Sequence, residues 1–239
     1  MFMDALNDYD VVKAPSFAYY IPNFISEDDE VYFIDKIESS PKPKWENLAH
    51  RRLQNWGGIV GKKGLISDEN IPEWLQSLMN RIVELGAFPP NSKPNHVLVN
   101  EYLPGQGIMP HVDGPLFFPV ITTVTLGSHG LLKFYRPINQ DDQAMNYSLE
   151  SRFVGSLLLE RRSCIVLTDD LYKLYLHGID SGVTADLLKA SAVWNLTQCG
   201  QRSRCKDGCE LIRDTRISLT IRNVPKVAKM TVNDLLYKR

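Results

Sequence analysis

The positions of apolar residues divide the chain into a helical part followed by a strand-rich part. The segment Ser26–Asp29 resembles a capping box, with Asp in place of Glu or Gln, and the apolar residues after it predict a helix to about Glu38. A second helix is predicted from about Pro72 to Leu85, because apolar residues recur there with a period near 3.6. The positions expected on the buried faces are Val31, Phe33, Ile34 and Ile37 in the first helix and Trp74, Leu75, Leu78, Ile82 and Leu85 in the second.

From Asn95 onward the pattern changes to short apolar runs separated by Gly, Pro and polar clusters, which is typical of β-strands. Two helices followed by at least seven short strands favour a mainly β (α+β) fold with flanking helices, packed as a β-sandwich or jelly roll. The predicted strands are His96–Leu103, Val120–Leu126, Leu131–Tyr135, Ser156–Leu159, Cys164–Leu167, Leu174–His177 and Arg216–Val224.

The length of 239 residues favours a single domain over two. Two polar insertions, 138–151 and 180–210, interrupt the predicted strands and are expected to be surface excursions, the second with a helical stretch at 185–192. The expected parts of the domain are N-terminal helices (1–94), a strand-rich core (95–224) and a C-terminal tail (225–239).

The overall charge changes this picture little. The formal net charge is −1, so any nucleic-acid surface must be a local basic patch. The chain has no apolar run near 18 residues and no apolar signal region in its acidic first ten residues. We therefore expect an intracellular protein, cytoplasmic and nuclear, without membrane association.

The four cysteines fall into two groups. Cys164 lies in an apolar run and is expected to be a core thiol. Cys199, Cys205 and Cys209 lie in a polar stretch without any C-x2-C pair, and a zinc site would need a fourth ligand. Ordinary reduced loop thiols are the favoured interpretation, and structural zinc is the alternative.

A candidate metal site is suggested by His111 and Asp113. Two residues apart, they can share a face of an extended segment and offer a metal one nitrogen and one oxygen. His177, between an apolar strand and Gly178, is the candidate third ligand. Two His and one carboxylate with open coordination positions are typical of non-haem Fe(II) oxygenases. The alternative is a loop His beside a solvated Asp, with His177 hydrogen-bonded in the core.

A second candidate site is the strand that begins at Arg216. Side chains alternate along a strand, so Arg216, Ser218, Thr220 and Arg222 share one face. The two arginine Cα atoms are then about 20 Å apart at ~3.3 Å per residue. A compact dicarboxylate could fit between the guanidinium groups, whereas a single carboxylate could not engage both. The alternative is a charged face on an edge strand.

Asn100 and Tyr102 precede the His-x-Asp motif and can donate hydrogen bonds to an anion, although they could also be an ordinary strand-end Asn and half-buried Tyr. Together the motifs Asn100-x-Tyr102, His111-x-Asp113, His177 and Arg216-x5-Arg222 resemble, in order and rough spacing, those of the AlkB-type Fe(II)/2-oxoglutarate dioxygenases. This resemblance covers about residues 95–224, and the segments 51–58, 95–100 and 216–222 are similar to one eukaryotic branch of that family.

The resemblance implies a double-stranded β-helix core and an Fe(II) ion held by His111, Asp113 and His177. It implies that 2-oxoglutarate and O₂ are co-substrates and that succinate and CO₂ are released. Hydroxylation of an N-methyl carbon in such an enzyme leads to formaldehyde. The iron supplies the difficult chemistry, and the protein positions it and excludes water.

The resemblance also assigns the anion-binding residues. Arg216, helped by Tyr102 and Ser218, would bind the distal carboxylate of 2-oxoglutarate. Arg222 and Asn100 would lie near the end of 2-oxoglutarate that chelates iron.

Residues 44–66 correspond in position to the nucleotide-recognition lid of that family. Basic residues with aromatic neighbours suit single-stranded nucleic acid or a flipped base. The alternative is a solvated loop with a core tryptophan. The residues predicted to contact the substrate are Lys44, Arg51, Arg52, Trp56, Lys62 and Lys63.

The chain departs from the repair-type members at Pro115, where several of them have an acidic residue two places after the Asp of His-x-Asp. This departure argues against direct repair of 1-methyladenine or 3-methylcytosine. The expected partner is DNA or RNA, single-stranded or with a flipped base. A protein substrate on the same fold and a nucleic-acid-binding module with little turnover are the alternatives.

Overall fold

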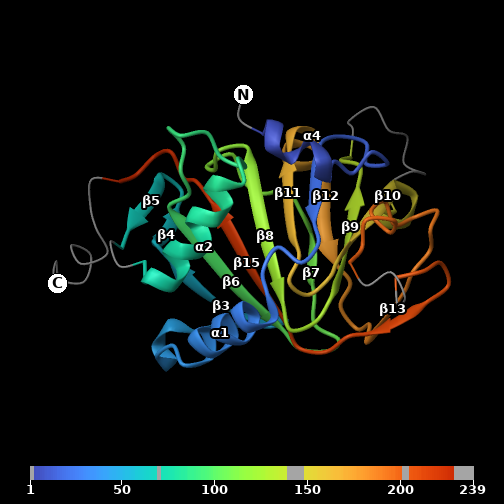
Figure 1. Ribbon diagram of the computed structural model, residues 1–239, viewed down its shortest axis with the longest axis horizontal. Coiled ribbons are helices and arrows are strands. Elements are labelled where there is room, and N and C mark those ends of the chain that lie inside the picture. The colour runs from blue at the N-terminus through green and yellow to red at the C-terminus, as the bar shows by residue number, and fades with distance from the viewer. Residues whose placement is uncertain (1–2, 69–70, 139–147, 201–204, 229–239) are drawn as a thin grey trace.

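The computed structural model describes residues 3–68, 71–138, 148–200 and 205–228, and its main feature is a pair of facing antiparallel sheets (Figure 1). The larger sheet has the order β1-β11-β8-β15-β6-β3-β2, and the smaller has the order β10-β9-β12-β7. This mainly β architecture is the predicted jelly roll. The strands of the larger sheet are β1 (Ala18–Ile21), β2 (Glu46–Leu48), β3 (Arg51–Trp56), β6 (His96–Tyr102), β8 (Val120–Leu126), β11 (Cys164–Thr168) and β15 (Arg216–Arg222).

Helices and two short hairpins surround the sheets. The smaller sheet consists of β7 (Ile108–His111), β9 (Gly130–Tyr135), β10 (Phe153–Leu159) and β12 (Leu176–Ile179). The hairpins pair β4 (Gly58–Gly61) with β5 (Gly64–Ser67) and β13 (Ala185–Leu187) with β14 (Glu210–Ile212). The helices are α1 (Glu27–Glu38), α2 (Glu73–Glu84), α3 (Leu149–Arg152) and α4 (Asp169–Lys173), with 3-10 turns η1 (Asp4–Tyr9) and η2 (Lys42–Lys44).

Helix α1 has the predicted capping box. The Ser26 hydroxyl accepts a hydrogen bond from the Asp29 amide at 3.0 Å, and the Asp29 carboxylate accepts one from the Ser26 amide at 3.1 Å. The burial of Phe33 and Ile37 confirms two predicted core positions, but Val31 is 68% exposed and its prediction was wrong. Glu30 takes the buried place instead, because positions 30, 33 and 37 line one side of the helix.

Helix α2 lies within one residue of its predicted limits and covers the outer face of the larger sheet together with α1 (Figure 1). Leu75, Leu78 and Ile82 are fully buried there, as predicted, whereas Trp74 and Leu85 are only partly buried. The apolar residues of both helices pack against alternate residues of the sheet, including Val97, Val99, Val124, Val166, Ile217, Leu219 and Ile221.

A second apolar cluster fills the space between the two sheets. It contains Tyr20, Phe134, Leu157, Leu159 and Ile165, which come from strands of both sheets. The strand prediction for 174–177 needs a correction at its start, because α4 ends just before it and β12 begins only at Leu176. The sequence pattern missed β1, β7 and the short strands of the region before α2.

The described residues of the segment 180–210 are not all on the surface, which corrects the predicted surface excursion. Cys199 and Cys205 are buried with Leu188 and Val193 in a third cluster, which packs on Leu131 and Leu158 of the smaller sheet. The predicted helix at 185–192 is absent, since residues 185–187 form β13 and residues 188–192 are not helical. The segment pairs with β14, and the buried carboxylate of Asp186 in β13 accepts a bidentate pair from Arg213 and contacts His129. Of the other insertion, residues 139–147 lie outside the described residues.

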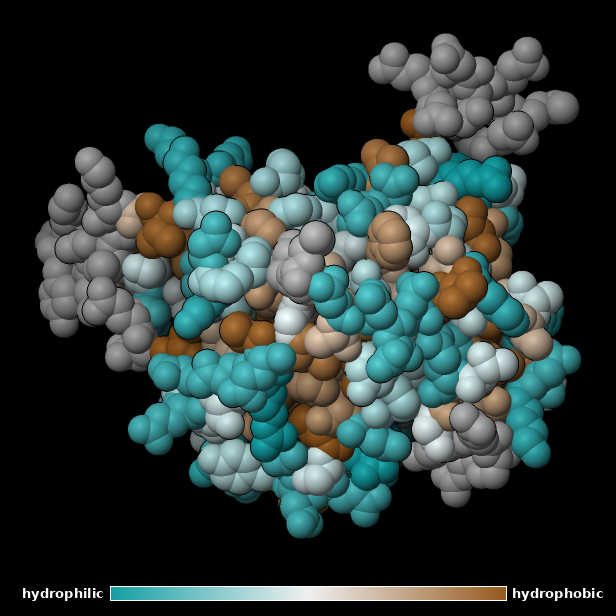
Figure 2. All heavy atoms as spheres, turned by 45° about the horizontal axis from the view of Figure 1, so that its top comes forward, coloured by the Kyte–Doolittle hydropathy of each residue, from teal (hydrophilic) through white to brown (hydrophobic). Residues whose placement is uncertain are grey.

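The surface in Figure 2 is mainly hydrophilic, with hydrophobic residues between the polar ones. Within the described residues, no helix has the length and apolar character needed to cross a membrane. The start of the predicted tail pairs with the β4–β5 hairpin, since the Leu65 amide donates to Lys226 and the Ala228 amide donates to Leu65.

Candidate active site

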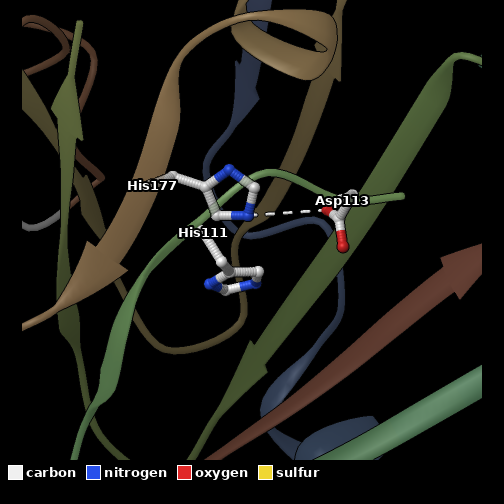
Figure 3. A group of neighbouring side chains, drawn as sticks. All are labelled: His111, Asp113 and His177. Carbon is white, nitrogen blue, oxygen red and sulfur yellow. Dashed lines mark ion pairs between the residues drawn. The ribbon is translucent and has the colours of Figure 1, made fainter. Parts of the chain in front are cut away.

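Strand register brings the three predicted metal ligands together. His111 at the end of β7 is directly opposite His177 on β12, and their ring centroids are 4.7 Å apart. Asp113 follows β7, and its Oδ2 lies 3.5 Å from His177 Nε2 (Figure 3). One donor atom from each residue lies within 4.8 Å of the others. This spacing suits a single metal ion with two nitrogen ligands and one oxygen ligand.

The surroundings orient the ring of His111 and favour the neutral, metal-binding form of His177. His111 Nδ1 lies 2.8 Å from the carbonyl oxygen of Met109, which can only accept, so Nδ1 is the donor in this contact and Nε2 is the nitrogen left for a metal. Burial lowers the pKa of His177 to about 4, although the charge of Asp113 opposes this shift. The imidazole of His177 can therefore act as a ligand without first losing a proton.

Arg216 is buried in the wall of the same cavity. Its Nη2 donates to Thr125 Oγ1 at 2.9 Å, and its Nε has no hydrogen-bond partner among the described residues. Gly130 makes room for the guanidinium, because a Cβ there would lie 2.8 Å from Arg216 Nε. Burial lowers the pKa of Arg216 to about 10, which still leaves it charged at neutral pH. A buried cation of this kind fits an anionic ligand.

Arg222 lies at the metal end of the cavity. Its Nη1 is 3.6 Å from Asp113 Oδ1, and its guanidinium carbon lies 4.4 Å from the centroid of the Phe117 ring. The phenol of Tyr172 donates to the carbonyls of Gly114 and Phe117 at 3.0 and 3.3 Å. These contacts hold the loop after Asp113 against the sheet.

One cavity of about 210 Å³ unites these groups. Although Arg216 and Arg222 lie at opposite ends of β15, both reach it, as the dicarboxylate argument requires. Its lining includes all eight predicted metal and 2-oxoglutarate residues, namely Asn100, Tyr102, His111, Asp113, His177, Arg216, Ser218 and Arg222. Apolar residues that the sequence motifs did not indicate complete the wall, among them Leu98, Ile108, Ile121 and Leu132.

Arg51 is a cavity residue as well, while its neighbour Arg52 is not. The Nε of Arg51 donates to Asn100 Oδ1 at 3.0 Å, inside the cavity. Arg52 points to the other face of β3, where it forms a bidentate pair with Glu101 at 2.6 and 2.7 Å and lies over the Trp45 ring. Arg52 therefore does not match the predicted phosphate contact. Strand alternation, applied to β3, would have separated the two arginines.

Trp56 is also directed toward the helix side of the sheet. Its ring meets Trp74 edge to face at 5.9 Å, its indole N–H donates to Gln54, and Lys44 covers the ring at 4.1 Å. These contacts favour the alternative of a core tryptophan over a stacking platform. Lys62 and Lys63 are exposed at the turn between β4 and β5 and do not line the cavity.

Comparison with known proteins agrees with this geometry. A sequence profile described as the 2OG-Fe(II) oxygenase superfamily matches residues 63–222. The chain belongs to this superfamily. It is 49% identical over 224 residues to a zebrafish (Danio rerio) protein named probable RNA/DNA demethylase ALKBH6, with 94% of this chain and 92% of the relative covered. The chain is accordingly an AlkB-type member and an Fe(II)/2-oxoglutarate-dependent dioxygenase, with O₂ as co-substrate.

More distant relatives share the fold. The tRNA (carboxymethyluridine(34)-5-O)-methyltransferase ALKBH8 of Mus musculus is 25% identical over 66% of this chain, which spans only 23% of that protein. A solved structure of OsALKBH1 superimposes with a TM-score of 0.54 at 14% identity, covering 86% of this chain and 96% of that one. A Pseudomonas putida prolyl-4-hydroxylase gives 0.53 at 12% identity over 94% of this chain and 98% of that one.

Proposed function

We propose that this dioxygenase oxidises a nucleic acid, hydroxylating or removing an alkyl group on a single-stranded or flipped base. One observation carries the proposal: the His–Asp–His group and Arg216 share a single cavity with Arg51, a cation from the edge region of the sheet. The name of the zebrafish relative, a probable RNA/DNA demethylase, supports the choice of nucleic acid.

The metal would be held by His111, Asp113 and His177. The proton on His111 Nδ1 fixes that ring with Nε2 available, and Asp113 supplies the negative charge that compensates the ion. When bound, Fe(II) with 2-oxoglutarate and O₂ supplies the oxidising power that hydroxylates a C–H bond. Arg222 would hold Asp113 in place through its 3.6 Å contact.

The residues of β15 and β6 would orient 2-oxoglutarate. The guanidinium of Arg216 is fixed by Thr125 and can offer its unpartnered Nε to the distal carboxylate. Tyr102, whose ring lies 5.7 Å from the Arg216 guanidinium, and Ser218 would add hydroxyl donors. The apolar lining would exclude water from the reacting atoms.

Substrate contacts would come from the hairpins beside the cavity. Arg51 is placed to contact a base or a phosphate that enters next to Asn100. Lys62 and Lys63, exposed on the β4–β5 turn, remain proposed phosphate contacts. Pro115 is exposed on the loop after Asp113, where several repair-type members have an acidic side chain. Because proline lacks a carboxylate, the substrate would differ from that of repair-type members.

The test is 2-oxoglutarate turnover in the presence of defined oligonucleotides. We expect methylated single-stranded RNA or DNA to stimulate succinate formation and formaldehyde release by the Fe(II)-loaded protein. A matched reaction with the His111→Ala/Asp113→Ala double variant should give neither product. Stimulation by methylated peptides together with no response to any oligonucleotide would contradict the proposal and favour a protein substrate.

A further inference from the structure

A second group of potential metal ligands lies outside the catalytic cavity. Glu160 follows β10, and its carboxylate meets the thiols of Cys199 and Cys205 from the segment that packs on the smaller sheet. One donor atom from each of the three lies within 4.8 Å of the others, and all three residues are buried. None of them lines the cavity that contains His111 and Arg216.

The carboxylate of Glu160 is held in a defined orientation. Its Oε2 accepts hydrogen bonds from the phenol of Tyr20 at 2.7 Å and from the amide of Gly200 at 2.8 Å. Its Oε1 faces Cys205, whose Sγ lies 3.5 Å away. One oxygen is thus anchored by β1 and the chain after Cys199, and the other is directed at a thiol, as in the supported ligands of metal sites.

The thiol of Cys199 is equally well placed. Its Sγ donates to the carbonyl of Asn195 at 3.5 Å. Asn195 is buried and clamped to β10, since its side chain exchanges two hydrogen bonds with the backbone of Leu158 at 2.8 and 2.9 Å. The ligand atoms therefore come from three parts of the chain that are each fixed to the sheet core.

We propose that Glu160, Cys199 and Cys205 bind a zinc ion that fastens the 180–210 segment to the smaller sheet. Thiolate ligands with a carboxylate oxygen form a donor set that zinc accepts in tetrahedral sites. Cys209 borders the same surface hollow as Glu160 and Cys205 but lies outside the group whose donor atoms are within 4.8 Å of one another, so the fourth position is left to a solvent ligand. The site would be structural and separate from the catalytic iron.

Zinc binding would require Cys199 to lose its proton. The hydrogen bond with Cys205, burial and the charge of Glu160 raise the pKa of Cys199 above its ordinary value, so its metal-free thiol is protonated. Zinc replaces the thiol proton: each cysteine that binds releases one proton and forms one sulfur–metal bond, with no change of oxidation state. The carboxylate of Glu160 supplies its oxygen without releasing a proton.

The experiment uses the full chain with the iron site disabled, so that it is independent of the proposed function. In the His111→Ala/Asp113→Ala background, we expect about one zinc ion per purified chain by elemental mass spectrometry. Replacement by Co(II) should give a sulfur-to-cobalt charge-transfer band and the strong visible bands of a tetrahedral site. This cobalt measurement needs no cysteine variant, so it holds even if such variants fold poorly.

Four variants in that background test the ligand set. Cys199→Ser and Cys205→Ser should each lose the zinc, whereas Cys164→Ser, a change at another buried thiol in β11, should retain it. Tyr20→Phe, which removes one support of Glu160, should weaken zinc affinity by about 10- to 100-fold.

Three results would overturn the proposal. The first is a parent protein with neither zinc nor the cobalt–sulfur band, and the second is zinc that survives both Cys199→Ser and Cys205→Ser. The third is a Cys199–Cys205 disulfide found by alkylation and mass spectrometry in freshly isolated protein, because this would make the pair a redox element.

Discussion

The two faces of the seven-stranded sheet are made of alternate residues of the same strands, yet one face packs in the apolar core and the other lines the catalytic cavity. On the helix face, Val97 and Val99 of β6 pack under α1 and α2 in the main apolar core. On the opposite face, Asn100 and Tyr102 of the same strand line the catalytic cavity with Arg216. The first face stabilises the fold, and the second holds buried polar groups that cost stability unless they are paired or bind a ligand.

This difference shows that register and alternation, rather than residue type, decide which side chains are functional. Arg51 and Arg52 are adjacent in β3, but only Arg51 reaches the cavity. Substitutions on the cavity face should therefore change turnover with little change in stability, and substitutions on the helix face should do the reverse.

The largest effect is expected at the metal. His111→Ala, Asp113→Ala or His177→Ala should each abolish 2-oxoglutarate decarboxylation, because two remaining ligands hold Fe(II) poorly and loss of the Asp also removes compensating charge. Binding of Fe(II), or of Mn(II) as a surrogate, and thermal unfolding should be measured on each variant. His50→Ala, at the exposed turn between β2 and β3, is a matched control that should retain wild-type turnover. Normal turnover in His177→Ala would remove that residue from the site.

Arg216→Ala should weaken 2-oxoglutarate binding by roughly 2–5 kcal/mol, because the distal carboxylate would lose its charged partner. This corresponds to about 30- to several-thousand-fold in dissociation constant. Arg216→Lys should recover only part of the affinity, since Lys lacks the bidentate fork. Calorimetry measures the effect, and Arg81→Ala, whose guanidinium pairs with Asp29 on the helix side, is the control. An affinity within about twofold of wild type for Arg216→Ala would contradict the assignment.

On the helix face, Ile82→Ala should lower the free energy of unfolding by about 2–5 kcal/mol, because it leaves a cavity in the core. Ile82 is fully buried between α2 and the sheet. The Michaelis constants for 2-oxoglutarate and the metal should stay at their wild-type values below the melting temperature. Urea unfolding and steady-state kinetics on the same preparation measure both quantities, and a selective loss of 2-oxoglutarate affinity would show that the two faces are coupled.

The residues of the cavity face could be predicted from the sequence because their spacings follow the two-residue alternation of a strand. The spacings of His-x-Asp and Arg-x5-Arg each predict side chains on one face, and this prediction does not require knowledge of the partner strand. The same rule separates Arg51 from Arg52 once residues 51–56 are known to be a strand, whereas the family resemblance predicts a lid there. The role of Trp56 in the core depends on its contacts with Trp74 and Lys44. Both residues pack on the Trp56 ring, and neither contact can be read from the local sequence pattern.

The segment 180–210 was not predictable for a different reason. Its polar composition indicates a solvent-exposed loop, and only tertiary contacts reveal that Asp186 is buried against Arg213. Cys199 and Cys205 likewise become core residues through contact with Leu131 and Leu158, which are distant in the chain. Local pattern cannot report burial that is created by long-range packing.

The arginine pair of β3 provides a smaller and more specific test. Arg51→Ala should lower kcat/KM for the nucleic-acid substrate by on the order of tenfold, because it removes a charged hydrogen-bond donor beside Asn100. Arg52→Ala should instead reduce stability by about 1 kcal/mol, since it breaks a half-exposed pair with Glu101, and should leave kcat/KM unchanged. Kinetics and urea unfolding of both variants separate the effects. Equal kinetic losses in the two variants would show that β3 contacts the substrate as a whole.

The smallest expected effect is a pH dependence that belongs to the cavity face. His96 shares that face of β6 with Leu98 and Asn100, is 2% exposed, and neither ring nitrogen has a hydrogen-bond partner among the described residues. Burial, assisted by the charge of Arg222, lowers its pKa from 6.5 to about 3. As the pH falls, His96 is therefore protonated in the unfolded chain before it is protonated in the folded protein. The free energy of unfolding stays constant above the unfolded pKa and decreases between that pKa and a pH of about 3.

Between about pH 7.5 and about pH 5.5, His96 should account for about 1 kcal/mol of lost unfolding free energy. The metal-free protein should be used, so that metal release from His177 does not enter the measurement. Urea unfolding of wild type and His96→Leu at both pH values isolates the contribution: the variant should lose about 1 kcal/mol less than wild type. If both proteins lose the same amount, His96 is not held neutral by the fold, and the cavity face admits water at the end of β6.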